Sequence, residues 1–529
     1  MTAAALLTLT TACSSGSTDR PAERQNQPAS YPDLPDALGR QVPDWSACPT
    51  PAASQDSLAT EPPGELSDGT AWECATLDAP LDYAEPTADT VELALVRART
   101  PVPAEERLGS LFFNFGGPGG SGVATLPQAS DSFEELRLGG YDLVSFDPRG
   151  VGESEGVRCL DDQARDEADQ LFSGVPDTEE EWRLADEQEA EFVAACVANS
   201  GPLLPHVTTA NTARDLDLMR HLLGDERLHY FGFSYGTQLG ATYAHLFPDR
   251  IGRTVLDAVV DPDPDPVHQG LLDARGFQLA LDHYLEACVQ QADCPVGPDP
   301  AAGNRWLAEL LADLEDEPLP TQYADGRRLT TALAYIGIAS TLYSEGSWEY
   351  LTEALTEIRD TGTGTTLLVL ADIYEGRNPT TGEYTTQSPS FTAIRCADQP
   401  GAGLTEDEVL GWEDEFRAES EVFGPYMVWS LTGCGDRWPV TDPVEPPDYD
   451  ATGAAEKLLL VATTGDPATP YEGAERMRAA LGGPDVAHLL SYDGEGHGAY
   501  TSSDPCVVTA VDDWLLTGEL PADNTGCPN

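Results

Sequence analysis

The stretch Gly232-Phe-Ser-Tyr-Gly236 constrains this chain more than any other feature of its sequence. An apolar run at 228–231 precedes it, and residues with helical spacing follow it at 237–247. In that setting the two glycines permit a sharp strand-to-helix turn, which raises the Ser234 hydroxyl above the edge of a sheet. A chance match is the alternative, since the chain contains 49 glycines. The context favours a nucleophile elbow with Ser234 as the nucleophile.

Strands and helices alternate along the chain from about residue 74 to residue 262. Short apolar runs bounded by Gly, Pro or Asp predict strands at 91–99, 110–115, 141–146 and 254–260. Helical spacing predicts a helix at 211–223. Strands that alternate with helices indicate an α/β fold, in which helices cover a mostly parallel sheet on both faces.

The alternation stops at the proline-rich segment 261–266, because successive prolines can extend neither a helix nor a central strand. Beyond it the pattern is mainly helical, with helices predicted at 271–289, 305–314, 331–343, 348–359 and 406–419. Alternation returns with strands at 457–462 and 487–492 and helices near 471–481 and 507–516. We therefore predict a core built from residues 50–262 and 451–529, with a large helical cap inserted at 263–450.

The N-terminal residues 1–13 predict a signal peptide for export. They resemble a bacterial lipoprotein signal, in which Cys13 becomes the lipidated first residue, although Thr10 stands where Leu is usual and the positively charged leader is missing. Residues 14–49, rich in Ser, Gly and Pro, predict a flexible tether. Secretion without a lipid is the alternative. We expect an extracellular protein, either secreted or anchored to the outer face of the cell membrane only through a lipid on Cys13.

The remaining cysteines form an even set, which suits disulfides in an oxidising compartment. Pairing neighbours in sequence predicts the bridges Cys48–Cys74, Cys159–Cys196, Cys288–Cys294, Cys396–Cys434 and Cys506–Cys527. A metal site is the alternative use of these residues, but the chain has no Cys-x-x-Cys pair. Sequence alone does not fix the connectivity.

The formal net charge of −63 argues against a nucleic-acid partner, because the phosphate backbone would be repelled. Lys457 is the only lysine among 28 basic residues. An acidic surface of this kind keeps a protein soluble at high ionic strength. A salt-tolerant source and an ordinary acidic exoenzyme are both compatible with it.

A serine nucleophile needs a base, and the base needs an acid to orient it. Of the eight histidines, His497 lies in the glycine-rich loop 494–498 just beyond the last predicted core strand, where an imidazole can approach the carboxyl edge of the sheet. In α/β hydrolases the acid lies between nucleophile and histidine in the chain. Asp466 follows the strand predicted at 457–462, and a turn-forming Asp before Pro is the alternative interpretation. The sequence therefore predicts the order Ser234, Asp466, His497.

The glycine-rich loop 116–122 follows the strand predicted at 110–115, where such folds build part of the oxyanion hole. Pro118 has no N–H, so we predict Gly117 as one donor and the N–H of Tyr235 as the other. A phosphate-binding loop is the competing interpretation, but the Gly-Lys-Ser/Thr ending and a G-x-G-x-x-G pattern in register are absent.

Several segments together resemble the secreted actinobacterial tripeptidyl aminopeptidases, which are α/β-hydrolase serine peptidases related to the proline iminopeptidases. The segments are Gly116-Gly-Pro-Gly-Gly-Ser-Gly122, Asp147-Pro-Arg-Gly-Val-Gly-Glu-Ser154, Gly232-Phe-Ser-Tyr-Gly236, Leu239-Gly-Ala-Thr-Tyr-Ala244, Phe247-Pro-Asp-Arg250 and Asp466-Pro-Ala-Thr-Pro470. The resemblance spans about residues 74–527. It implies that Ser234, Asp466 and His497 act as nucleophile, acid and base, and that the cap limits access to peptides with a free amino terminus.

The sequence thus predicts a serine exopeptidase that works through an acyl-enzyme on Ser234, without metal or organic cofactor. The resemblance implies that it releases short peptides, namely tripeptides. A carboxylesterase is the main alternative, because the same triad serves esters. A binding module without activity is a further alternative, which the presence of all three triad residues disfavours. An aminopeptidase needs a carboxylate for the substrate ammonium, and Asp398 and Asp261 are the candidates. Arg149 is predicted to form a structural ion pair.

Overall fold

A computed structural model describes residues 31–50, 62–171, 175–176, 178–323, 325–439 and 448–529. The predicted signal peptide, Cys13 and residues 14–30 of the predicted tether lie outside these residues. The rest of the predicted tether, residues 31–49, is ordered: it contains α1 (Asp36–Gly39) and a strand that pairs with the sheet. A ten-stranded sheet runs through the core in the order β1-β2-β3-β5-β4-β6-β7-β8-β9-β10. The strands are β1 (Ser46–Ala47), β2 (Glu73–Pro80), β3 (Thr90–Ala98), β4 (Gly109–Asn114), β5 (Tyr141–Phe146), β6 (Leu228–Phe233), β7 (Ile251–Asp257), β8 (Leu458–Gly465), β9 (Ala487–Glu495) and β10 (Thr525–Pro528).

From β5 to β10 along this order, all neighbouring strands are parallel, and only the pairs at the β1 edge are antiparallel. Every residue of β4 and β5 is buried, as expected for central parallel strands covered on both faces. One face packs against α6 (Thr209–Leu223), α7 (Tyr235–Leu246) and α17 (Tyr471–Leu481), and the other against α2 (Gly122–Gln128), α3 (Glu134–Leu138) and α18 (Pro505–Thr517). The predicted α/β-hydrolase architecture is confirmed.

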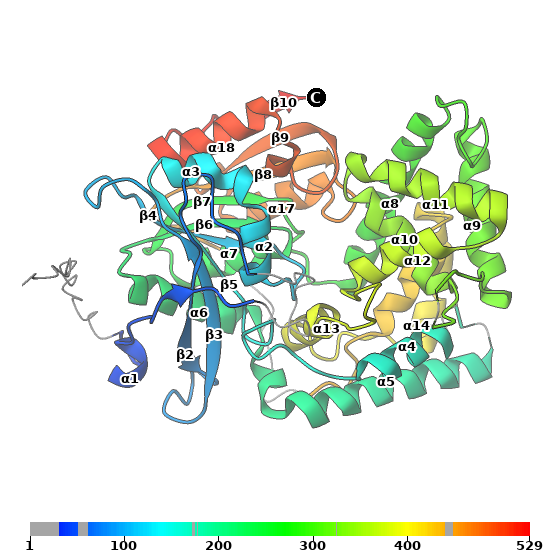
Figure 1. Cartoon of the computed structure of the whole chain (residues 1–529), viewed down its shortest axis with the longest axis horizontal. Helices are drawn as coiled ribbons and strands as arrows, with labels where there is room; N and C mark the ends of the chain where they lie inside the picture. The colour runs from blue at the N-terminus through cyan, green and yellow to red at the C-terminus, as the bar shows by residue number, and fades with distance from the viewer. Residues whose placement is uncertain (1–30, 51–61, 172–174, 177, 324, 440–447) are drawn as a thin grey trace, which may run out of the picture.

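A group of helices follows β7 and precedes β8, within the stretch predicted as a cap. They are α8 (Pro266–Cys288), α9 (Pro300–Asp316), α10 (Thr331–Leu342), α11 (Trp348–Thr361), α12 (Thr365–Tyr374), α13 (Gln387–Asp398), α14 (Glu406–Leu410), α15 (Glu413–Glu419) and α16 (Gly424–Met427). Most of them share a hydrophobic core that is separate from the two faces of the sheet. Figure 1 shows these helices beside the sheet, with α13 between the two parts.

Two helices from the first half of the chain also contact this cap. They are α4 (Asp162–Leu171) and α5 (Glu179–Ser200), which Figure 1 shows along the lower edge beneath the cap helices. Arg377 Nε donates to Asp166 Oδ1 of α4 at 2.9 Å, and the Trp182 ring of α5 lies 4.4 Å from the Trp429 ring. The sequence interpretation assigned these helices to the core segment 50–262. Their contacts show that the covering layer draws on both halves of the chain.

The five disulfides join neighbours in sequence, as predicted: Cys48–Cys74, Cys159–Cys196, Cys288–Cys294, Cys396–Cys434 and Cys506–Cys527. Closing loops of 6 to 38 residues stabilises a fold by about 2–4 kcal/mol per bridge. Among the described helices, none combines the length and the apolar character that a membrane crossing requires.

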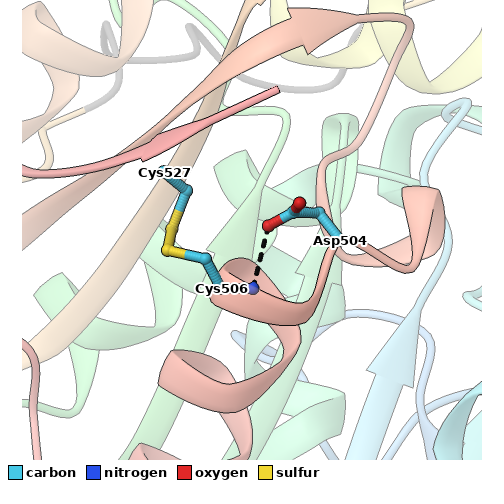
Figure 2. Close-up of side chains that lie close together, drawn as sticks. All are labelled: Asp504, Cys506 and Cys527. Atoms are coloured by element: carbon cyan, nitrogen blue, oxygen red, sulfur yellow. Dashed lines mark hydrogen bonds between the residues drawn. A yellow bond between two sulfur atoms is a disulfide. The ribbon is translucent and has the colours of Figure 1, made fainter.

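One group of potential metal ligands lies close together within the described residues, namely Asp504, Cys506 and Cys527 (Figure 2). The two sulfur atoms are bonded to each other. Asp504 Oδ1 accepts the backbone N–H of Cys506 at 2.9 Å and so caps the start of α18. This group therefore serves the fold and presents no thiolate to a metal.

Candidate active site

Ser234 occupies the turn between β6 and α7 with a backbone φ of 54° and ψ of −127°. Such a conformation is strained for a residue with a Cβ, and it persists because neighbours on both sides hold it. The backbone N–H of Ser234 donates to the Asp257 carbonyl at 3.0 Å. A Cβ on Gly232 would lie 2.3 Å from the Gly236 carbonyl oxygen, so the close approach of the backbone at these two positions requires glycine at 232. The turn is the predicted elbow, and it leaves Ser234 partly exposed.

His497 and Asp466 meet at the carboxyl edge of the sheet, beyond β9 and β8. His497 Nδ1 lies 2.9 Å from Asp466 Oδ1 and 3.1 Å from Asp466 Oδ2. Asp466 Oδ1 also accepts the backbone N–H groups of Ala468 and Thr469, at 3.0 and 2.9 Å. Nδ1 must therefore donate to this acceptor, which leaves Nε2 as the imidazole's free acceptor. The predicted acid and base are in the relation that the chemistry requires.

The His497 loop also contacts the elbow. A Cβ built on Gly498 would lie 3.9 Å from Cδ1 of Phe233, the residue before Ser234, and 3.8 Å from Asp257 Oδ2. The elbow strand, the acid loop and the histidine loop thus converge at one end of the sheet, although 263 positions separate Ser234 from His497 in the chain.

Asp257, at the end of β7, is a second carboxylate beside His497 that the sequence interpretation did not include. Its oxygens accept the backbone N–H groups of Ala499 and Tyr500 at 3.0 and 2.8 Å. Burial raises the pKa of Asp257 to about 6, although these two hydrogen bonds favour its charged form. Burial disfavours the charged imidazole of His497, but the Asp466 and Asp257 carboxylates outweigh burial and raise the His497 pKa above its usual value.

We expect the pH dependence of kcat/KM to report this raised pKa. A general base must be neutral, so activity should fall as the pH is lowered through the His497 pKa, with the acidic limb above pH 6.5. Asp257→Asn removes one of the charges that stabilise the imidazolium, so its acidic limb should move to lower pH. The measurement is a pair of pH profiles on an ester without an amino group. An unmoved limb in Asp257→Asn would show that this carboxylate does not act on His497.

The glycine-rich loop after β4 lies directly against the elbow. A Cβ on Gly116, whose φ is +90°, would lie 2.8 Å from the Ser234 Cβ and 3.2 Å from the Tyr235 nitrogen. Asn114 Oδ1 accepts the Gly116 N–H at 3.1 Å, and the Gly117–Pro118 peptide is cis. Gly117 comes next in the loop, and Tyr235 is the first residue of α7. Both predicted donors therefore belong to segments in contact beside Ser234, and their role in an oxyanion hole stays a prediction.

The cap reaches the site through α8 and the end of α10. Gly276 of α8 packs so closely on the acid loop that a Cβ there would lie 2.4 Å from the Pro467 carbonyl oxygen. The Tyr343 ring meets the His497 ring edge-on, with the ring centroids 5.2 Å apart. The backbone carbonyl of Tyr343 accepts the backbone N–H of His497 at 2.9 Å. These cap contacts were not predicted, because no local motif marks Tyr343.

A third cap contact comes from α13, which crosses the glycine-rich loop. A Cβ on Gly119 would lie 2.5 Å from the Gln387 carbonyl oxygen and 2.8 Å from the Phe391 nitrogen. The Phe391 side chain is 38% exposed. The cap therefore covers the site from the acid side, the base side and the oxyanion side.

The two carboxylates proposed from sequence for the substrate ammonium are held in internal contacts. Asp398 accepts the N–H and the hydroxyl of Thr209 at 2.8 and 2.6 Å, and burial raises its pKa to about 6. Asp261 accepts Arg476 Nε at 2.5 Å and lies 3.4 Å from His268 Nε2. Neither geometry favours substrate binding, so that assignment stays a prediction without support.

The structural interpretation of Arg149 agrees with its contacts. The side chain is fully buried, and its Nε and Nη2 each donate to an oxygen of Asp215 at 2.7 Å. The backbone carbonyls of Pro80, Leu81 and His206 accept further hydrogen bonds from its guanidinium. All of its contacts are internal to the core, which leaves the catalytic chemistry to other residues.

Comparisons with known proteins agree with this geometry. Residues 110–343 match the family described as "alpha/beta hydrolase fold", and residues 420–527 match the family described as "TAP-like protein". The chain is 35% identical to serine protease Hip1 of Mycobacterium tuberculosis over 509 residues, covering 93% of this chain and 91% of that protein. It is 33% identical to carboxylesterase B of Mycobacterium tuberculosis, covering 86% of each. It is also 31% identical to tripeptidyl aminopeptidase of Streptomyces lividans, covering 86% of this chain and 83% of that protein.

Proposed function

The chain belongs to the α/β-hydrolase family of the tripeptidyl aminopeptidases and serine protease Hip1, and on that premise we propose that it is an exported serine exopeptidase that releases short peptides from free amino termini. It is a serine hydrolase of the peptidase type. The finer assignment depends mainly on one observation, the close packing of the cap on the acid and histidine loops through Gly276 and Tyr343. A site covered in this way favours a short acyl side over an extended chain.

The proposed reaction uses this chain's residues in two steps. The Ser234 hydroxyl attacks the scissile carbonyl while His497 Nε2 takes its proton, and the Asp466 carboxylate stabilises the imidazolium that forms. The N–H groups of Gly117 and Tyr235 are the proposed donors to the oxyanion. The imidazolium then protonates the leaving amine, an acyl-enzyme remains on Ser234, and a water activated by the neutral imidazole hydrolyses it.

Export is supported by the five disulfides, since such bonds persist in oxidising compartments. Lipidation of Cys13 stays a proposal, because that residue lies outside the described part of the chain. The net charge of −63 supports a protein without a nucleic-acid partner.

The proposal predicts that the enzyme requires a free substrate amino terminus. Acetylating the amino terminus of a tripeptide p-nitroanilide removes the positive charge and adds bulk at the covered end of the site. We expect kcat/KM to fall by about 30- to 1,000-fold, the loss of a partly buried, charge-assisted interaction. The measurement compares the free and acetylated peptides under one set of conditions, with p-nitrophenyl butyrate as an ester.

A carboxylesterase is the second candidate, favoured by the 33% identity to carboxylesterase B. An esterase has no use for the substrate ammonium, so it should tolerate the acetyl group. Equal cleavage of both peptides, or turnover of the ester with neither peptide cleaved, would contradict the exopeptidase assignment and leave the triad in place.

A further inference from the structure

Asp273 lies on α8 beside the covered end of the active site. It precedes by one helical turn Gly276, which packs on Pro467 of the acid loop, and Phe277, whose ring lies 5.7 Å from the Tyr343 ring. Residues three and four apart share a helix face, so Asp273 lies on the face of α8 that meets the acid loop and Tyr343. Its side chain is partly exposed.

Three tyrosines of the cap lie within electrostatic reach of this carboxylate. Tyr343 and Tyr374 join their hydroxyl groups at 3.0 Å, and the Tyr343 ring also meets the His497 ring. Burial, with a contribution from the negative charge of Asp273, raises the pKa of Tyr335, Tyr343 and Tyr374. The carboxylate therefore lies within electrostatic reach of all three phenols, one of which, Tyr343, meets the His497 ring.

Asp273 has no hydrogen bond and no ion pair with any residue in the described part of the chain. Burial raises its pKa to about 7, although the positive charge of Arg395 on α13 opposes this, and Asp261 adds to the rise. Asp282 on the same helix differs, because the amides of Gln278 and Asn304 both donate to its Oδ1 at 2.8 Å. Burying an unpaired carboxylate in an apolar, aromatic setting costs folding free energy unless a ligand supplies the missing hydrogen bonds and the opposite charge.

We propose that Asp273 binds the α-ammonium group of the peptide substrate, with the faces of Tyr335, Tyr343 and Tyr374 around the cation. A primary ammonium supplies the hydrogen-bond donors that the carboxylate lacks, and aromatic faces attract a cation. The proposal rests on the proposed exopeptidase function and adds the residue that selects the substrate. It restricts the enzyme to peptides with an unblocked amino terminus and excludes acylated and pyroglutamyl peptides.

The test measures Asp273→Asn, Asp273→Glu and the matched control Asp282→Asn on the free peptide, the acetylated peptide and the ester. Asp273→Asn should lower kcat/KM on the free peptide by about 30- to 1,000-fold. The kcat/KM values on the free and the acetylated peptide should then be nearly equal. Ester turnover and labelling of Ser234 by a fluorophosphonate should change by less than about twofold, since neither needs the ammonium. Asp273→Glu should restore part of the preference, and Asp282→Asn should retain all of it.

The outcomes separate this inference from the proposed function. A wild-type preference for the free peptide that survives in Asp273→Asn would overturn the role of Asp273 and leave the exopeptidase in place. Equal cleavage of both peptides by the wild type would overturn both proposals. A parallel loss of ester turnover and of labelling would show that Asp273 supports the fold, which also overturns the inference.

A second measurement leaves Asp273 intact. Ser234→Ala protein is titrated calorimetrically at pH 7 with a free tripeptide amide in two buffers that differ in ionisation enthalpy. A carboxyl group whose pKa is raised to about 7 must lose its remaining proton to pair with an ammonium, so binding should release a fraction of a proton. The acetylated peptide should bind more weakly and release none. Equal binding without proton release would contradict the proposal.

Discussion

Ser234→Ala protein is expected to fold like the wild type and to lose turnover by about 10⁴- to 10⁶-fold. The substitution removes the only atom that attacks the substrate, while the acid, the base and the oxyanion loop remain. Alanine carries the same Cβ as serine, so the strained φ of 54° is no worse in the variant. The melting temperature should change little, because the substitution opens no core cavity.

The measurement combines kcat on the peptide with thermal unfolding and circular dichroism. Ser340→Ala is the matched control, since among the described residues the Ser340 hydroxyl donates only to the Gly337 carbonyl of its own helix. That variant should keep near-normal activity. Turnover within tenfold of the wild type by folded Ser234→Ala protein would contradict the acyl-enzyme mechanism.

The core could be predicted from the sequence because its signals are local. Buried parallel strands produce short apolar runs, and the cap begins where prolines interrupt the alternation. The contacts of α4 and α5 with the cap could not be predicted in this way. Their ion pairs, such as Asp166 with Arg377, join residues more than 200 positions apart, and an acidic surface helix carries no signal of its partner.

The same distinction applies to the candidate site. Ser234, Asp466 and His497 each lie in a glycine- or proline-marked loop at a strand end, so each could be predicted from its neighbours. Asp257 and Tyr343 were missed because their roles arise from contacts with the His497 loop, which is distant in the chain. Asp398 was proposed for substrate binding from sequence, but both of its carboxylate oxygens accept hydrogen bonds from Thr209. No sequence pattern reveals this contact.

Asp466→Asn should lower kcat/KM by about 10³- to 10⁴-fold through a change of the histidine tautomer. The backbone N–H groups of Ala468 and Thr469 both point at Oδ1, so they fix the amide oxygen of asparagine there. The amide nitrogen then takes the place of Oδ2, 3.1 Å from His497 Nδ1. This nitrogen donates towards Nδ1 and so competes with the bond from Nδ1 to the oxygen at the Oδ1 position, 2.9 Å away. It thereby favours the tautomer with the proton on Nε2, which can no longer take the proton of Ser234.

The pH profile distinguishes this mechanism from a simple loss of charge. A wrong tautomer is not corrected by raising the pH, so the loss in Asp466→Asn should persist on the alkaline plateau of kcat/KM. If Asp466 acted only by raising the His497 pKa, the variant would instead show a shifted limb and a normal plateau. Asp493→Asn on β9 is the matched control, because it removes an exposed carboxylate near the same sheet edge and should leave the plateau unchanged. A large loss in Asp257→Asn together with a small one in Asp466→Asn would transfer the role of the acid to Asp257, which already holds the loop behind His497 through two backbone N–H groups.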